Sequence, residues 1–288
     1  MDQAIINGLA EGSVYALLAL GLVFIHRITE VASFAHGEVS AMAAFVGFSI
    51  WQSTGLPFWM AIAGSVATGA VLGAVIERVA VRRVQASGIL ATTVVTLGLY
   101  FVLHGSVRAV WGPEVRPYPS IFGDATLRVG GVAVSTQHIG VMATSLLIAL
   151  GLSAYLRFTE TGLSLRAIPQ NPYGAAVMGL DIRRLRAVSW IVGSAVGAVA
   201  GVLIAPLTFL NSNMMTSPLI KAFAVAALGG LDSLLGAFVG GLLLGVVENV
   251  VVLYISSYLK DSLAFVFILL VLLVTPEGLF GKPRREKV

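Results

Sequence analysis

Residues 4–24 read AIINGLAEGSVYALLALGLVF, an apolar run whose single charge is Glu11. At a rise of 1.5 Å per residue, about 20 apolar residues cross the roughly 30 Å hydrocarbon core of a bilayer. The start of the chain lacks the basic region of a signal peptide, and no small-residue cleavage site precedes a soluble stretch. We therefore expect this run to be a retained transmembrane helix.

Similar runs recur along the whole chain. They cover residues 37–54, 57–77, 89–110, 138–156, 187–208, 232–255 and 261–276. Residues 217–231 are also apolar but too short to span alone, which predicts a broken or re-entrant helix whose backbone is covered by protein or water. The expected fold class is an all-α transmembrane bundle of about eight spans plus this short helix. We expect residues 1–288 to form a single transmembrane domain.

The composition supports a membrane class and excludes several chemistries. The chain is 57% hydrophobic and 11% charged, whereas soluble domains carry about 25% charged residues. It has no cysteine, which excludes disulfides and thiolate metal sites. We expect no catalytic residue, no metal and no cofactor bound by this chain, because neither a metal-ligand pairing of histidines nor a G-x-x-x-x-G-K-[ST] loop occurs. We also expect no nucleic-acid partner. The four histidines are His26, His36, His104 and His138.

The distribution of basic residues predicts the orientation. With the N-terminus outside, most of the 18 Lys and Arg residues fall in cytoplasmic segments, as the positive-inside rule requires. These cytoplasmic residues are Arg27, Arg78, Arg82, Arg83, Arg157, Arg166, Arg183, Arg184, Arg186, Lys282, Arg284, Arg285 and Lys287. The outer side receives Arg108, Arg116, Arg128 and Lys260, with Lys221 near the interface. We therefore expect an outer N-terminus and a cytoplasmic C-terminus.

Two polar loops separate the spans. Residues 111–137 are rich in proline and predict a compact extracytoplasmic cap with some short strand. Residues 157–186 form a long cytoplasmic loop in which an apolar stripe predicts a short amphipathic surface helix. Basic residues follow the stripe, where the C-terminal helix dipole would favour them. The stripe comprises Ala175, Ala176, Met178, Gly179 and Ile182.

Glycines four residues apart recur within the spans, and this spacing allows helix backbones to approach closely. The pairs are Gly8 with Gly12, Gly69 with Gly73, Gly193 with Gly197 and Gly201, Gly236 with Gly240, and Gly241 with Gly245. The sequence leaves two interpretations open. The glycines either pack helices within one subunit or form a contact with another subunit.

Three carboxylates fall within or beside the spans: Glu11, Asp232 and Glu248. Such groups mark ion or solute paths in many carriers, and Asp232 follows the Gly229-Gly230 break, where a helix N-terminus would favour it. Each carboxylate is either a structural hydrogen-bonding group or a lining residue of a polar path. Because the three are dispersed, they give only weak support to an ion-coupled carrier.

Three stretches together resemble the membrane permeases of bacterial branched-chain amino acid ATP-binding-cassette importers. They are EVASFAHGEVSAMAAFVGF (30–48), RAIPQNPYGAAVMGLDIRRLRAVSWIVGSAVGAVAGVL (166–203) and AVAALGGLDSLLGAFVGGLLLGVVE (224–248). In that family a Phe-Ala-His-Gly step opens the second span, and a Leu-Gly-Gly-x-x-Ser step leads into a glycine-rich helix. The length resembles that of the shorter of the two paired permeases.

The resemblance implies a heteromeric importer in a bacterial inner membrane. Its partners would be a second homologous permease, two ATPases that bind ATP and Mg, and a periplasmic solute-binding protein. The resemblance also implies that the 157–186 loop docks onto an ATPase. The implied coupling residues are Arg166, Asn171, Pro172, Ala175, Ala176 and Gly179. Gly174 stands where the wider pattern has an acidic residue, which favours shape fit over a salt bridge as the basis of docking.

Two breaks in the helical pattern lie in corresponding places of the two halves and suggest a weak internal repeat with the translocation path between them. The residues of the breaks are Phe34, His36, Gly37 and Glu38 in the first half, and Gly229, Gly230, Asp232 and Ser233 in the second. We expect the first break at the cytoplasmic end of the first two spans. There Gly37 would permit a bend, and His36 and Glu38 would bond freed backbone groups.

Three functions remain open from the sequence. The first is the permease subunit of an importer for branched-chain amino acids. The second is the same architecture serving another small solute, such as urea, an amide or a sugar. The third is a stand-alone ion-coupled carrier.

Overall fold

The computed structural model describes residues 1–254 except 124, 130 and 131. Beyond residue 254 it describes only 262, 265, 266, 269, 270, 273–275 and 278–280, and the side chains of Ala86, Val129 and Val132 are not described. The expected span at 261–276 and the basic residues from Lys282 onward therefore lie largely or wholly outside the described residues. Every statement below refers to the described part of the chain.

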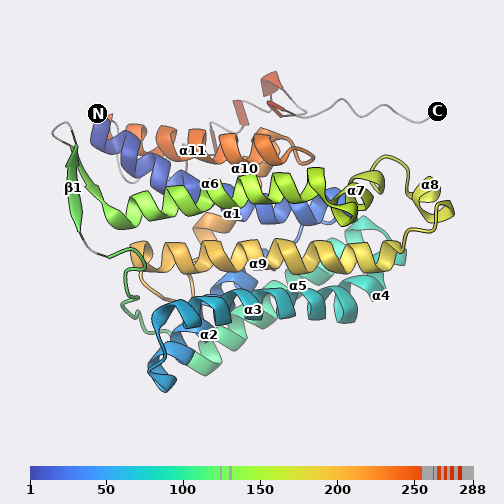
Figure 1. Ribbon diagram of the computed structural model, residues 1–288, viewed down its shortest axis with the longest axis horizontal. Coiled ribbons are helices and arrows are strands. Elements are labelled where there is room, and N and C mark those ends of the chain that lie inside the picture. The colour runs from blue at the N-terminus through green and yellow to red at the C-terminus, as the bar shows by residue number, and fades with distance from the viewer. Residues whose placement is uncertain are drawn as a thin grey trace.

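Six described helices are long and apolar enough to cross a membrane, and they lie roughly side by side along the long axis of the molecule (Figure 1). They are α1 (Asp2–Thr29), α3 (Phe58–Ile76), α5 (Ile89–Trp111), α6 (Thr136–Phe158), α9 (Ile182–Thr208) and α11 (Leu234–Tyr254). Helix α3 is extended by a π-helical turn, η1 (Glu77–Val81), and by α4 (Arg82–Val84). A 3₁₀ turn, η2 (Gln85–Ser87), precedes α5. The all-α membrane bundle expected from the sequence is confirmed.

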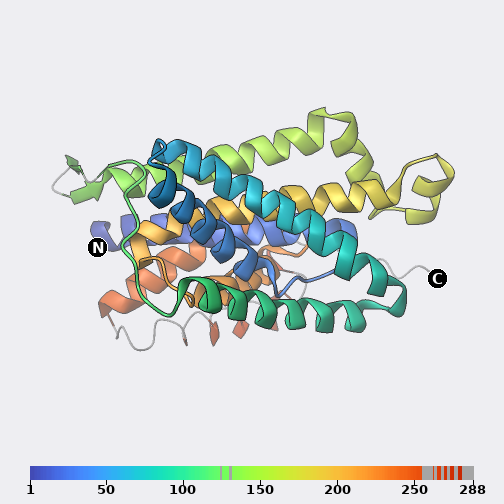
Figure 2. The same ribbon diagram turned by 90° about the horizontal axis from the view of Figure 1, so that it is seen from below.

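Helix α1 is the centre of the bundle. It is buried along most of its length and packs on α6, α9, α10 and α11. Figure 2 shows α5 and α6 on opposite sides of the bundle, with α1 and α9 between them. A helix that is apolar all round is expected in the interior of a bundle, which explains why residues 4–24 carry so little polarity.

The bundle has two distinct ends. The N-terminus and an antiparallel hairpin of β1 (Thr126–Val129) and β2 (Val132–Ser135) lie at one end, here called the hairpin end. Helices α7 (Glu160–Ala167) and α8 (Pro172–Val177) lie at the opposite end, here called the α8 end (Figure 1). The strands confirm the short strand expected in the cap. A backbone bridge between Arg116 and Leu210 ties the cap to the chain that follows α9.

The glycine pairs pack helices within this chain. A Cβ on Gly8 would lie 2.7 Å from the carbonyl oxygen of Gly245, and a Cβ on Gly12 would lie 2.6 Å from that of Gly241. These contacts make α1 and α11 close antiparallel neighbours. Gly193 likewise faces Gly21 of α1, while Gly69 and Gly73 of α3 face the backbone of α9. The first of the two interpretations, packing within one subunit, therefore holds for these glycines.

Two shorter helices complete the bundle: α2 (His36–Thr54) and α10 (Thr216–Gly229). Helix α10 follows α9, which ends at the hairpin end, and precedes α11, whose first residues lie with Arg27 at the α8 end. The chain between α9 and α11 therefore passes from one end of the bundle to the other, and does not turn back as a re-entrant segment would. Its helix has only 14 residues, about 21 Å at 1.5 Å per residue.

Candidate functional site

The loop at the α8 end is built from capped helices. Asn171 caps α8 by accepting a hydrogen bond from the Gly174 amide at 2.9 Å, and Pro172 occupies the first turn. The helix ends at Val177, and the turn that follows it includes Gly179, which has a φ of 82° and donates to the Ala176 carbonyl at 3.0 Å. A left-handed glycine at this position is a common helix terminator. Asn171, Pro172 and Gly179 therefore define the two ends of α8.

Helix α8 carries an exposed apolar surface, which we call the α8 tip and define as Tyr173, Val177 and Met178. These side chains are 81%, 69% and 82% exposed, respectively. Ala176 is also exposed, whereas Ala175 is buried against the neighbouring elements. Figure 1 shows α8 projecting beyond the ends of the long helices. The three residues of the α8 tip do not belong to the hydrophobic core of this chain.

The prediction of a single amphipathic helix in this loop was wrong about where the helix ends. Helix α8 ends at Val177, so the apolar stripe is divided: Met178 and Gly179 follow α8, and Ile182 begins α9. The basic residues lie in the first turns of α9, after Asp181, which caps that helix by accepting from the Arg184 amide at 3.1 Å. These basic residues therefore lie at the start of α9 and not at the C-terminal end of α8, because Asn171 and Asp181 cap two separate helices.

Arg166 lines a cavity of about 750 Å³ at the α8 end. Arg27, Arg157, Glu30 and Asp232 line the same cavity. Glu30 precedes the first helix break and Asp232 belongs to the second. The structure thus brings one residue from each break region to a common cavity, which the sequence could not show.

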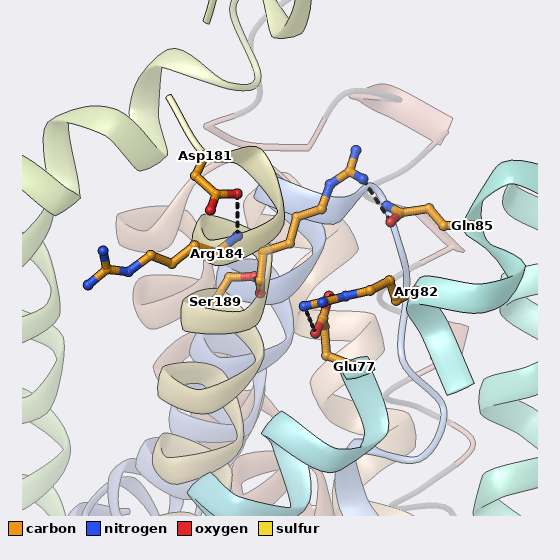
Figure 3. A network of polar contacts seen from close by, with 7 residues as sticks. Glu77, Arg82, Gln85, Asp181, Arg184 and Ser189 are labelled. Carbon is orange, nitrogen blue, oxygen red and sulfur yellow. Dashed lines mark hydrogen bonds and ion pairs between the residues drawn. The ribbon is translucent and has the colours of Figure 1, made fainter. Parts of the chain in front are cut away.

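Polar side chains beside this loop pair within the segment that follows α3, and between that segment and α9 (Figure 3). Arg82 donates two hydrogen bonds to the Glu77 carboxylate, at 3.0 and 2.7 Å, and Arg186 donates to the Gln85 side chain at 2.8 Å. Residues five apart do not share a face of a regular α-helix, but the π-helical turn at 77–81 places Arg82 over Glu77. Sequence analysis missed this pair because α-helical spacing does not predict it.

The first helix break lies inside the bundle, and the expectation that it lies at a cytoplasmic end was wrong. Residues 30–35 return along α1 before α2 begins, so His36 and Glu38 are only 2% and 1% exposed. His36 packs against Gly21 of α1 and Gly197 of α9. Glu38 pairs with Nδ1 of His104 on α5 at 3.2 Å and does not bond freed backbone groups. Helix α2 begins in the interior because these glycines leave room for the His36 ring.

Two contacts attach the first break to the short helix α10. The rings of Phe34 and Phe223 lie 4.9 Å apart between centroids. A Cβ on Gly37 would lie 3.0 Å from the Leu219 side chain. The first break and the short helix therefore form one packed unit within the bundle.

The second break is a turn between α10 and α11. Gly229 approaches the backbone of Gly236, Gly230 adopts a φ of 92°, and Ser233 accepts a hydrogen bond from the Gly236 amide at 3.0 Å. Ser233 is thus the cap of α11, whereas we expected Asp232 at that position. Asp232 is exposed and faces the cavity at the α8 end.

Glu248 belongs to a buried cluster that the sequence did not predict. Its Oε2 atom lies 3.1 Å from Nζ of Lys221 and 3.3 Å from the hydroxyl of Tyr15. Lys221 also lies 3.4 Å from that hydroxyl and 5.1 Å from the centre of the Tyr15 ring. We had placed Lys221 near an outer interface, but it is 5% exposed and lies in α10. The cluster joins α1, α10 and α11.

Glu11 lies one helical turn before Tyr15 of this cluster. It is half-buried on α1 and accepts a hydrogen bond from the Asn249 side chain at 3.1 Å. Among the described residues, no group of three His, Asp or Glu side chains is placed to hold a metal ion. Two pairs of ionisable side chains connect helices in the described interior, Glu38 with His104 and Lys221 with Glu248.

These features define a multi-pass membrane protein with interior charge pairs, two interrupted helices and a loop that projects from one end. Comparison with known proteins assigns it more closely. Residues 4–274 match the model of the family described as branched-chain amino acid transport system / permease component, and the chain belongs to that family.

Three relatives resemble the chain over almost its full length. The high-affinity branched-chain amino acid transport system permease proteins LivH of Salmonella typhimurium and of Escherichia coli K12 are each 32% identical to it, over 300 and 303 residues. The corresponding protein BraD of Pseudomonas aeruginosa is 32% identical over 301 residues. Each comparison covers 99% of this chain and 97% of the relative.

Proposed function

We propose that this chain is the permease subunit of an ATP-driven importer of branched-chain amino acids in a bacterial inner membrane. Its family and the names of its relatives support the solute class. ATP hydrolysis takes place on separate ATPase subunits, a second homologous permease completes the path, and a periplasmic binding protein delivers the solute. The polar groups of this chain then organise passage and coupling and perform no covalent chemistry.

The observation that carries the coupling part of the proposal is the α8 tip. Apolar side chains that project into water without a core to join are typical of interaction surfaces. Asn171, Pro172 and Gly179 fix the two ends of this short helix, so the tip is presented in one conformation. We infer that Ala176 and the α8 tip insert into a cleft of an ATPase subunit.

The basic residues support the orientation. At the α8 end lie Arg27, Arg78, Arg82, Arg83, Arg157, Arg166, Arg183, Arg184 and Arg186, and at the hairpin end lie Arg108, Arg116 and Arg128. The positive-inside rule then makes the α8 end cytoplasmic and the hairpin end periplasmic. This orientation places the α8 tip where ATPases bind and the hairpin where a binding protein docks.

Reconstitution of the complete importer in vesicles tests the proposal. We expect leucine uptake that requires the binding protein, both permeases and ATP hydrolysis. ATP-dependent uptake of urea, an amide or a sugar in place of leucine would show that the proposed solute is wrong and that the proposed ATP-driven importer is right. Uptake that persists without the ATPases and collapses with an uncoupler would instead establish an ion-coupled carrier.

A further inference from the structure

We propose that a cavity between α1, α9 and α10 binds the branched aliphatic amino acid during passage, through its ammonium group and its side chain. This inference rests on the proposed function, and it assigns the binding to particular residues. The cavity has a volume of about 220 Å³ and lies nearer the hairpin end than the α8 end, beside the start of α10 and the end of α9.

The walls of the cavity are mainly aliphatic. The apolar lining residues are Val14, Ile204, Leu207, Met214 and Pro218. They come from α1, α9, α10 and the connection between α9 and α10, so all three helices contribute to one surface. Small-molecule sites are typically apolar concavities with a few convergent polar groups. Walls of this kind fit a branched aliphatic side chain.

One carboxylate gives the cavity its charge. Glu11 lines the cavity together with Thr208 and Ser217. Asn249 of α11 donates to Oε2 of Glu11 at 3.1 Å, which positions this carboxylate from the neighbouring helix. A carboxylate attracts an ammonium group and repels an anion. Thr208, whose hydroxyl donates to the Ile204 carbonyl at 3.2 Å, and Ser217 add polar surface to the cavity beside this carboxylate.

Tyr15, one of the lining residues, also belongs to the buried cluster of Tyr15, Lys221 and Glu248. Tyr15 lines the cavity one helical turn beyond Glu11, and its hydroxyl contacts both Glu248 and Lys221. Three helices therefore fix the position of the Tyr15 ring. A site whose walls are held by such contacts presents its polar groups without further ordering, which favours binding.

The larger cavity at the α8 end is less suited to this ligand. It is wider, about 750 Å³, and it carries several charges of both signs, including Arg27, Arg166 and Asp232. An aliphatic side chain would bind weakly there. Burial against apolar surface is the main source of affinity for such a group, and the lining of this cavity is largely polar or charged. The smaller cavity is therefore the better match for a branched-chain amino acid.

The absence of native cysteine makes a direct test available. In the assembled importer in membrane vesicles, Ser217→Cys provides a single thiol in this chain, and its modification is followed by the mass of the chain. We expect a cationic methanethiosulfonate reagent to label this thiol faster than an anionic one, because Glu11 lies in the same cavity. We also expect leucine to slow the labelling and glutamate to leave it unchanged.

Three further variants complete the comparison. Thr126→Cys, on the exposed strand β1, should be labelled at the same rate with and without leucine. Adding Glu11→Gln to Ser217→Cys should remove the preference for the cationic reagent and raise the leucine concentration needed for protection by about tenfold or more, as expected when a hydrogen bond to a charged group is lost. Glu114→Gln, an exposed carboxylate in the cap, should change neither result.

Leucine protection that depends on Glu11 would support the site. An unreactive Ser217→Cys thiol, labelling that leucine does not slow, or equal protection by glutamate would overturn it. Failure of this inference can be told from failure of the proposed function by measuring uptake in parallel. An importer that transports leucine with ATP but shows no protection refutes only the site, whereas an importer that transports no branched-chain amino acid refutes the proposed function.

Discussion

Lys221 and Glu248, which are 27 positions apart in the sequence, form an ion pair inside the bundle. The distance between Nζ and Oε2 is 3.1 Å, and the two side chains are 6% and 0% exposed. A charge in this environment is costly unless a partner of opposite sign lies beside it. The pair joins α10 to α11.

We expect Lys221→Met to destabilise the protein strongly, because the change leaves the Glu248 carboxylate buried without its cation. Breaking one side of a buried ion pair typically costs about 3–5 kcal/mol. Thermal unfolding of the purified chain in detergent would show a marked fall in Tm. The double variant Lys221→Met/Glu248→Gln should recover much of the loss, since neither charge remains. A double variant as unstable as the single one would contradict this account.

The glycine contacts predict a contrast between two helical glycines. Gly12→Ala should destabilise the bundle, because the added Cβ would lie 2.6 Å from the Gly241 carbonyl oxygen and α1 would have to move away from α11. Gly98→Ala on α5 should be neutral or slightly stabilising, because no atom lies within 4 Å of its added Cβ and alanine favours the helix by about 1 kcal/mol. Unfolding temperatures of the two variants under identical conditions provide the measurement, and equal values would refute the contrast.

The pair of Glu38 and His104 predicts a local effect on α5. This helix is the least buried of the six candidate spans, so few other contacts hold it in place. Glu38→Leu removes the 3.2 Å contact with His104 and should increase amide hydrogen exchange across residues 89–111 more than across α1. The exposed control Glu114→Gln should leave both regions unchanged. Exchange that rises equally everywhere would mean that the pair supports the whole fold instead.

The α8 tip predicts a loss of coupling without a loss of folding. Val177→Asp places a charge on a side chain that is 69% exposed, so we expect normal insertion and stability but greatly reduced co-purification of the ATPase subunits. Val115→Asp is the matched control, because Val115 is 64% exposed at the opposite end. We expect this variant to leave co-purification of the proposed ATPase subunits unchanged. Full retention of the ATPases by Val177→Asp would remove α8 as the docking element.

The choice of residues for that test follows from the structure. Ala175 is buried, and Gly179 has a positive φ that a side chain would strain. A bulky substitution at either position would disturb the loop itself and would not report on docking. Ala176 and Val177 are exposed, so changes there act on the surface offered to a partner.

The apolar runs predicted most of the helices to within a few residues, because about 20 apolar residues in a row have one stable arrangement in a bilayer. The capping residues of the long loop, Asn171 and Asp181, were present in the sequence as well. The role of Asp181 was missed because the apolar stripe was followed across it to Ile182. A cap ends the helical periodicity, so residues on opposite sides of Asp181 do not share a face.

The sequence by itself determined the membrane class, the helical spans, the glycine positions that permit close packing and the family resemblance. Each of these follows from local composition or from residues close together in the chain. Only the tertiary structure decided that His36 and Glu38 lie in the interior, that Lys221 meets Glu248, and that Glu11 faces an aliphatic cavity. These relationships join helices that are distant in sequence, and they depend on which helices pack together, which no local pattern encodes.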